Sequence, residues 1–338
     1  MISLAVKYRP QILDDIVGQI SIVKILKRQI QTNEFKNCYL FAGASGCGKT
    51  TAARAFANQI NNGVGNPIEI DAASNNGVDN VRSIVANAQE RAIVGKYKIY
   101  IIDEAHSMTS QAWQAFLKCI EEPPTYTIFI FCTTDPQKIP DTILNRVQRF
   151  NFAKIDENII KDRLDYICKQ EKFLNYEDSI SYISKICNGS MREAISLLDK
   201  CAGYSNEISL DNVLYVLGGY SFDDYFNLIN SLIDCNQELT FKIFEVIYKK
   251  NADLKLFVDR FISFCLDISK YLIFKDMSCT SLPNSMEEQV KNCTNFDNAN
   301  SWYMYVLDKL LNYKNMLKTD SNPKSTLEIG LSQIVRCQ

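Results

Sequence analysis

Short apolar runs alternate with helical patterns over residues 38–152, and this alternation predicts a parallel β-sheet covered by helices. The apolar runs cover residues 38–41, 68–70, 99–102, 127–132 and 147–152. Between them, apolar residues recur at helical spacing over 48–61, 77–91 and 109–122. We therefore expect an α/β core whose apolar helix stripes pack on the sheet.

Helical periodicity replaces the strand pattern after residue 152. Residues 156–219 predict a small helical lid, and the pair Gly218-Gly219 marks its end. Long amphipathic helices are expected around 226–233, 241–247 and 254–273, with polar breaks at 275–288 and 320–324. The pattern thus predicts three domains: a core over 1–155, the lid over 156–219 and a second all-helical domain over 220–338.

The composition is that of an ordinary globular protein. The chain has 338 residues, of which 46% are hydrophobic and 22% charged. Its net charge of -2 argues against a globally basic nucleic-acid binder, so any DNA contact must come from a local face. The first twenty residues contain no apolar leader, and no stretch of 18 apolar residues follows. We therefore expect a cytoplasmic protein with no membrane partner.

The cysteines show no metal-binding or disulfide spacing. There are twelve, but the closest two, Cys38 and Cys47, are nine residues apart, and His106 is the only histidine. We expect reduced, mostly buried thiols and no zinc site.

A phosphate-binding loop follows the first apolar run. The segment GASGCGKT matches G-x-x-x-x-G-K-T, in which glycines let backbone N–H groups surround phosphate oxygens, the lysine reaches the β and γ phosphates and the threonine suits Mg²⁺. The next helix directs its positive end at the same anion. The alternative is an ordinary glycine-rich turn. The residues are Gly43, Ala44, Ser45, Gly46, Cys47, Gly48, Lys49 and Thr50, followed by Thr51. We expect them to bind a nucleoside triphosphate.

Acidic and hydroxyl side chains follow two later strands. Asp103 and Glu104 end the run at 99–102, where Asp103 can hold Mg²⁺ and Glu104 can accept a proton from the water that attacks the γ phosphate. Thr134 follows the run at 127–132 and can orient that water or sense the γ phosphate. Solvated strand ends and a plain turn are the alternatives.

Two arginines are candidates for stabilising the charge of a transferring phosphoryl group. Arg192 follows Asn188-Gly189-Ser190 in the predicted lid, and Arg146 precedes the last strand, with Arg149 as a competitor. Taken alone, either arginine is more often a surface charge than a catalytic residue.

Short motifs are spread over the first 194 residues. They are YRP at 8–10, VGQ at 17–19, the phosphate loop, IEIDAAS at 68–74, DEAH at 103–106, EEPP at 121–124, TTDPQKIP at 133–140 and GSMREA at 189–194. With these motifs the chain resembles a family: the ATPase subunit of bacterial-type clamp loaders, the DNA polymerase III gamma/tau subunit of the AAA+ class. Residues 1–219 resemble the family's two ATPase domains, and 323–336 resembles the last helix of its collar domain. The resemblance therefore implies that 220–338 is a helical collar that oligomerises.

The resemblance implies roles for individual residues. Lys49 and Thr50 would act on phosphate and Mg²⁺, Asp103 on the metal and Glu104 as the base. Thr134 takes the first sensor position and Arg192 the second, within the same subunit, whereas Arg146 corresponds to the arginine supplied to a neighbour's ATP. Around the adenine the family places the positions of Tyr8, Arg9 and Val17.

The chain also departs from the family's pattern. A four-cysteine zinc module usually follows the phosphate-loop helix, but residues 59–67 form a short cysteine-free link. The family's Ser-Arg-Cys is here Asn145-Arg146-Val147, and the chain ends at Gln338, as in the short, gamma-like form.

The resemblance further implies the cofactors ATP and Mg²⁺ and a set of partners: other clamp-loader subunits in a ring or spiral, expected to be a pentamer, a sliding clamp and primer-template DNA. The family contacts DNA through helix N-termini, which suits phosphate binding without sequence reading. The candidates are Asn75, Asn76, Arg82, Thr109 and Ser110, which helix capping and solvation explain equally well.

Three functional hypotheses remain beside a clamp-loading motor. A helicase fits the DEAH motif but requires a second RecA-like sheet. A scaffold would bind ATP as an assembly signal with incidental hydrolysis. A protein-unfolding machine lacks support because no aromatic-hydrophobic-Gly loop lies between the two nucleotide motifs.

Overall fold

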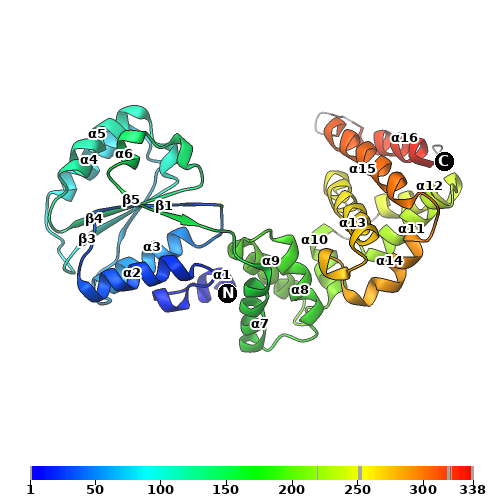
Figure 1. The fold of residues 1–338 in the computed structure, drawn as a ribbon, viewed down its shortest axis with the longest axis horizontal. Coiled ribbons are helices and arrows are strands. Elements are labelled where there is room, and N and C mark those ends of the chain that lie inside the picture. Colours follow the sequence, from blue (N-terminus) through cyan, green and yellow to red (C-terminus); the bar gives the residue numbers. More distant parts are fainter. Residues whose placement is uncertain (1, 219, 250–252, 318–319, 321, 336–338) are drawn as a thin grey trace. The chain divides into compact units, whose positions relative to one another are not determined.

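Five parallel strands form the sheet in the order β2-β3-β4-β1-β5. Each lies within two residues of its predicted position: β1 Cys38–Gly43, β2 Ile68–Asp71, β3 Lys98–Asp103, β4 Thr127–Thr133 and β5 Gln148–Phe152. The computed structural model describes residues 2–218, 220–249, 253–317, 320 and 322–335 (Figure 1). Within these residues there is no second sheet, which argues against the two-sheet helicase hypothesis.

Helices cover both faces of the sheet, as Figure 1 shows. On one face lie α2 Ile20–Thr32 and α3 Lys49–Ile60, and on the other α4 Val78–Ala88, α5 Ser110–Glu121 and α6 Asp141–Leu144. Because side chains alternate along a strand, Tyr39 packs against Phe56 of α3 at 5.3 Å between ring centroids, whereas Phe129 packs against Phe116 of α5 at 5.5 Å. These four rings are fully buried, and each stabilises the core by about 1.5–3 kcal/mol.

Short elements connect the sheet to the site. The chain begins with α1 Leu4–Lys7 and the 3-10 turn η1 Leu13–Asp15, and further turns, η2 Ala105–Ser107 and η3 Pro136–Lys138, follow β3 and β4. The sequence reasoning did not anticipate α1, α2 or α6.

The helical half begins with α7 Glu157–Glu171, α8 Glu177–Ile186, α9 Met191–Tyr204 and α10 Leu210–Gly218. It continues with α11 Phe222–Ile233, α12 Gln237–Lys249, α13 Leu254–Phe274, the turns η4 Met277–Cys279 and η5 Asn284–Met286, α14 Glu287–Thr294, α15 Ala299–Met316 and α16 Pro323–Val335. No helix in the described ranges combines the length and apolar character that crossing a membrane requires.

The predicted helices of this half are present, most of them longer than expected, and α14 and α15 were missed. Helix α11 begins four residues early because Ser221 and Asp224 form a capping box. The expected polar break at 275–288 contains the two 3-10 turns and the first residues of α14, and α15 was not predicted. Helix α16 includes Lys324, so the second break is shorter than expected. Residue 336, the expected end of the last helix, lies outside the described residues.

The chain separates into two compact units. The first is Met1–Ile167 with Cys187–Asp199, and the second is Cys168–Ile186 with Lys200–Gln338. Stacked rings on α13 and α11 form the core of the second unit, with Phe257 and Phe261 at 5.7 Å and Tyr225 at 5.7 Å from Phe257. The three-domain division stays a prediction, and Gly219 of its second boundary lies outside the described residues.

Candidate functional site

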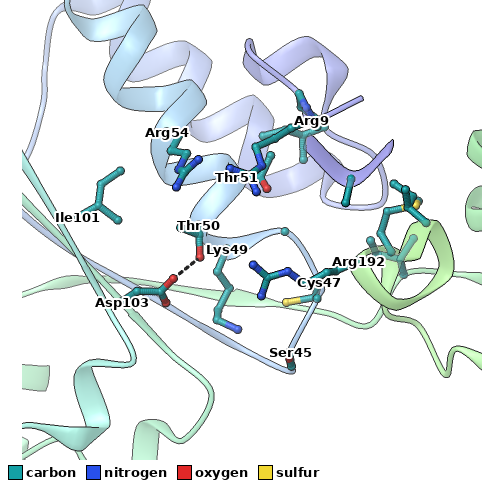
Figure 2. A pocket seen from close by; sticks show the side chains of 18 of the residues that line it. Arg9, Ser45, Cys47, Lys49, Thr50, Thr51, Arg54, Ile101, Asp103 and Arg192 are labelled. Atoms are coloured by element: carbon teal, nitrogen blue, oxygen red, sulfur yellow. Dashed lines mark hydrogen bonds between the residues drawn. The ribbon is translucent and has the colours of Figure 1, made fainter. Parts of the chain in front are cut away.

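A cavity of about 390 Å³ opens beside the phosphate loop in the first unit (Figure 2). Its walls come from the N-terminal segment, the loop, the edge of the sheet and the start of α9. The lining residues are Ala5, Tyr8, Arg9, Pro10, Ile16, Val17, Ser45, Gly46, Cys47, Gly48, Lys49, Thr50, Thr51, Arg54, Glu69, Ile70, Asp71, Ile101, Asp103, Glu104, Ile155, Met191, Arg192 and Ile195. Segments far apart in the sequence therefore converge here.

The phosphate loop wraps around the Lys49 ammonium group. Lys49 is 7% exposed, and its Nζ donates to the carbonyl oxygens of Gly43 at 2.9 Å and Ala44 at 2.8 Å. Gly48 ends the loop at φ +102°, a conformation that favours glycine. Gly43 and Ala44, both predicted to bind nucleotide, do not line the cavity and instead hold this cation in the described structure. An entering phosphate would offer the buried ammonium a charged partner.

Thr50 and Asp103 meet at the end of the loop. The Thr50 hydroxyl donates to Asp103 Oδ2 at 2.8 Å, drawn as the dashed line in Figure 2. The other carboxylate oxygen of Asp103 accepts from the backbone N–H of Glu104 at 3.0 Å, which fixes the carboxylate. A hydroxyl and a carboxylate oxygen are ligands that suit Mg²⁺, so this pair fits the predicted metal.

Glu104 contacts residues that follow β3 and β4. Its Oε2 accepts from the Thr134 hydroxyl at 3.3 Å and lies 3.3 Å from His106 Nδ1, which is also 3.2 Å from Thr133 Oγ1. Glu104 lines the cavity, whereas Thr134 reaches it only through Glu104. Sequence reasoning quoted His106 for its motif but missed its contact with the candidate base.

The first turn of α9 closes over the phosphate loop. The backbone N–H of Met191 donates to Gly46 O at 3.1 Å, and Gly46 has a φ of +73°. A Cβ at Gly46 would lie 2.0 Å from Ser190 Oγ and 3.0 Å from Ser190 Cβ, so a larger residue would force Ser190 to move as well as strain the backbone. The contact brings Arg192 into the cavity wall, while its role as a second sensor stays a prediction.

Three guanidinium groups face the cavity. Burial lowers the pKa of Arg9, and the nearby charges of Arg54 and Arg192 lower it further, while Glu69 opposes them. Arg54 forms an ion pair with Glu69. Like charges gathered around a cavity raise its affinity for an anion. Sequence reasoning missed Arg54 and Glu69, although Arg54 lies one helical turn after Thr50 and so shares its face.

Gln19 connects the N-terminal wall of the cavity, formed by residues 5–17, to the phosphate loop. It is 4% exposed, and its Nε2 donates to Cys47 O at 3.3 Å and to Ala153 O at 2.8 Å. Its Oε1 accepts from the N–H of Ala153 at 3.3 Å. These bonds place the segment with Tyr8, Arg9 and Val17 beside the cavity, where all three line it.

Arg146 lies outside this cavity. Its guanidinium pairs with Glu121 at 2.8 Å and donates to the carbonyl of Thr142 at 2.7 Å, and its side chain is 40% exposed. Its competitor Arg149 bonds Asn151 on the same strand, at 2.8 Å. Arg146 is thus available at the surface of the first unit, while its role for a neighbouring subunit stays a prediction.

The DNA candidates gather at the start of α4 and α5. Asn76 O accepts from the N–H of Thr109 at 3.3 Å, and the Thr109 hydroxyl caps α5. Arg82 pairs with Asp79 at 3.1 Å, Asn75 donates to the carbonyl of Asp71, and Ser110 is exposed. Capping thus accounts for Thr109, and the DNA role of all five stays a prediction.

The cysteines of the described residues are free thiols. Nine are buried, and Cys235 and Cys279 are exposed. In the ranges that the structure describes, no group of three or more His, Cys, Asp or Glu side chains is placed to hold a metal. The expectation that the protein uses no zinc stays a prediction.

Known proteins resemble the chain along most of its length. DNA polymerase III subunit tau of Bacillus subtilis is 32% identical over 98% of this chain and 62% of its own length. DNA polymerase III subunit gamma of Buchnera aphidicola subsp. Schizaphis graminum is 35% identical over 64% of this chain and 65% of its own. A family profile described as DNA polymerase III, delta subunit, matches residues 68–156. The chain thus spans less than two thirds of these relatives.

Solved structures share the fold. The RuvB Holliday junction branch migration motor of Thermotoga maritima superposes with a TM-score of 0.53 at 20% identity, over 67% of this chain and 79% of that one. This similarity confirms the predicted fold class, a parallel sheet followed by helices.

Proposed function

We propose that the protein is an ATP-hydrolysing subunit of a clamp loader. The proposal starts from the family to which the chain belongs, that of DNA polymerase III gamma/tau subunits. ATP binding would assemble a spiral that opens a ring-shaped sliding clamp on primer-template DNA, and hydrolysis would release the clamp. The observation that carries the proposal is the convergence of Lys49, the Thr50–Asp103 pair, Glu104 and Arg192 on one cavity.

The site's residues divide the chemistry among them. Lys49 and the backbone N–H groups of residues 45–51 bind the β and γ phosphates. Mg²⁺, held by Thr50 and Asp103, would neutralise phosphate charge. Glu104, oriented by Thr134, accepts the proton of the attacking water, and Arg192 stabilises the charge on the γ oxygens. This division requires the Thr50 hydroxyl to release Asp103 when the ligands bind.

Arg146 would act on the ATP of the neighbouring subunit. Two observations support this: the guanidinium lies outside its own cavity, and Glu121 with Thr142 hold it at a half-exposed position. A site completed across an interface makes hydrolysis depend on assembly. The other partners of the proposal are companion clamp-loader subunits in a ring or spiral such as a pentamer, a sliding clamp and primer-template DNA, all in the cytoplasm.

The test is steady-state ATPase activity of the assembled complex, with and without primed DNA plus a bacterial sliding clamp. We expect stimulation for the wild type, loss of nucleotide binding for Lys49→Ala, and loss of at least about 100-fold in stimulated kcat with retained binding for Arg146→Ala. The matched control is Arg149→Ala, which removes a nearby guanidinium whose recorded bond is to Asn151.

Each outcome separates one part of the proposal. Full stimulated activity in Arg146→Ala would refute the trans role and leave the ATPase intact. A wild-type complex that binds ATP but shows no stimulation by DNA and clamp would refute clamp loading and favour the assembly scaffold.

A further inference from the structure

Tyr8, in the N-terminal wall of the cavity, is attached to the first helix after the sheet. The Arg163 guanidinium of α7 donates to the backbone carbonyl of Tyr8 at 2.9 Å. The Tyr166 ring of the same helix meets the Tyr8 ring edge-on, with centroids 6.3 Å apart and planes at 90°. Arg163 also lies over the Tyr166 ring at 5.2 Å, so the two side chains support each other. All three residues belong to the first unit.

This wall has little structure of its own. Helix α1 is four residues long, and the chain from Arg9 to Ile12 is irregular. Within the wall, the N–H groups of Tyr8 and Arg9 donate to backbone carbonyls of α1, at 2.9 Å and 3.3 Å. Further along, the N–H of Leu13 donates to Gln59 at 3.1 Å, Asn58 donates to the carbonyl of Gln11 at 3.3 Å, and Gln19 makes its bonds to Cys47 and Ala153. Arg163 and Tyr166 thus attach Tyr8 to α7, whereas Gln11 and Leu13 are attached to α3.

We propose that Arg163 and Tyr166 form a latch, called the α7 latch below, that positions the N-terminal wall against the nucleoside half of the bound nucleotide. The inference rests on the proposed function only in taking the ligand to be a nucleoside triphosphate. Both side chains act through Tyr8 and are positioning residues, because neither lines the cavity.

The two halves of the ligand depend on different elements. The triphosphate half is held by residues 45–51 and Arg192. The hydrogen bond between Met191 N–H and Gly46 O joins this loop to the helix that carries Arg192. The α7 latch touches none of these residues in its recorded contacts. Loosening it should therefore weaken binding of a nucleotide but spare a ligand that has phosphates without a base or sugar.

The experiment measures displacement of a fluorescent ATP analogue from the full-length protein, in the presence of Mg²⁺, by ATP and by inorganic tripolyphosphate. The variants are Arg163→Ala, Tyr166→Ala and Tyr166→Phe, which keeps the ring. Asp162→Ala is the matched control, since it removes an exposed charge next to Arg163 on α7. Thermal unfolding of each variant verifies that it folds.

We expect Arg163→Ala to weaken displacement by ATP about tenfold, as for a lost hydrogen bond from a charged donor. Tyr166→Ala should weaken it about threefold, and Tyr166→Phe should restore wild-type affinity. Displacement by tripolyphosphate should change less than about twofold in every variant.

Two results would overturn the latch: unchanged ATP affinity in Arg163→Ala, or an equal loss for ATP and tripolyphosphate, which would mean general loosening of the unit. Failure of the proposed function looks different, because the wild type itself would then bind neither ligand.

Discussion

Replacing Gln19 with alanine should destabilise the first unit and loosen its phosphate loop together. Gln19 is the residue through which the N-terminal segment reaches both the loop carbonyl of Cys47 and the backbone of Ala153 beyond β5. Alanine removes all three hydrogen bonds at a position that is 4% exposed.

The magnitude follows from the lengths of these bonds. The bond to Ala153 O, at 2.8 Å, is short, and the two at 3.3 Å are weaker. Each lost bond costs about 1 kcal/mol, with the short one near the upper part of the range, so the sum is about 3 kcal/mol. For a unit of this size, that lowers Tm by about 6–12 °C.

The assay is urea and thermal unfolding of the full-length protein, followed by the first unit's own tyrosine and tryptophan signals. Gln114→Ala is the matched control, because Gln114 is exposed on α5 and alanine is a good helix former. We expect the control to stay within about 0.5 kcal/mol of the wild type.

A second measurement connects stability to the site. Because Cys47 O loses its donor, Gln19→Ala should also bind ATP more weakly, by about threefold to tenfold. A Gln19→Ala protein that unfolds within about 0.5 kcal/mol of the wild type would refute the reasoning. Such a result would mean that water replaces the Gln19 side-chain amide without loss of stability.

Two further predictions concern the phosphate loop and the thiols. Gly46→Ala should weaken ATP binding at least about tenfold, because the new Cβ would lie 2.0 Å from Ser190 Oγ. Gly77 has a φ of −77° and no atom within 4 Å of a Cβ built there, so Gly77→Ala should bind ATP normally. Equal affinities of the two variants in titration calorimetry would contradict the prediction. With Cys337 replaced by serine, iodoacetamide at pH 8 should label the exposed Cys235 and Cys279 within minutes and leave Cys38 unlabelled. Burial raises the pKa of Cys38 to about 12, so its reactive thiolate is rare. Peptide mass spectrometry of the native protein, with unfolded protein as the control, measures the labelling, and early labelling of Cys38 would contradict the prediction.

The strands and the phosphate loop were predictable because their signals are local. A strand buried on both faces must be a continuous apolar run, as in Ile99 to Ile102, and the loop needs glycines at fixed spacing. Asp103 could be placed beside Thr50 because β1 and β3 end at one edge of a parallel sheet.

The walls of the cavity were not predictable in the same way. Arg163 and Tyr8 are 155 residues apart, and nothing in either neighbourhood indicates the other. Glu69 meets Arg54 because β2 pairs with β3 in a particular register, with Glu69 opposite Ile101. Such contacts depend on how α3 packs on the sheet and how α7 contacts the N-terminal segment, which periodicity does not specify. By contrast, α15 had a local signal in Trp302, Tyr303 and Val306 that could have been read.

The contact between the phosphate loop and α9 uses main-chain atoms at both ends, Gly46 O and the N–H of Met191. Any displacement of the loop by an anion is therefore passed to the first turn of α9 by the backbone, and no side chain at position 191 is required for it. In a saturation scan read out by nucleotide-dependent protection of α9 from proteolysis, Met191 should accept many residues, while substitutions at Gly46 should reduce the protection. The response of α9 to an occupied loop would then depend on the absence of a Cβ at Gly46.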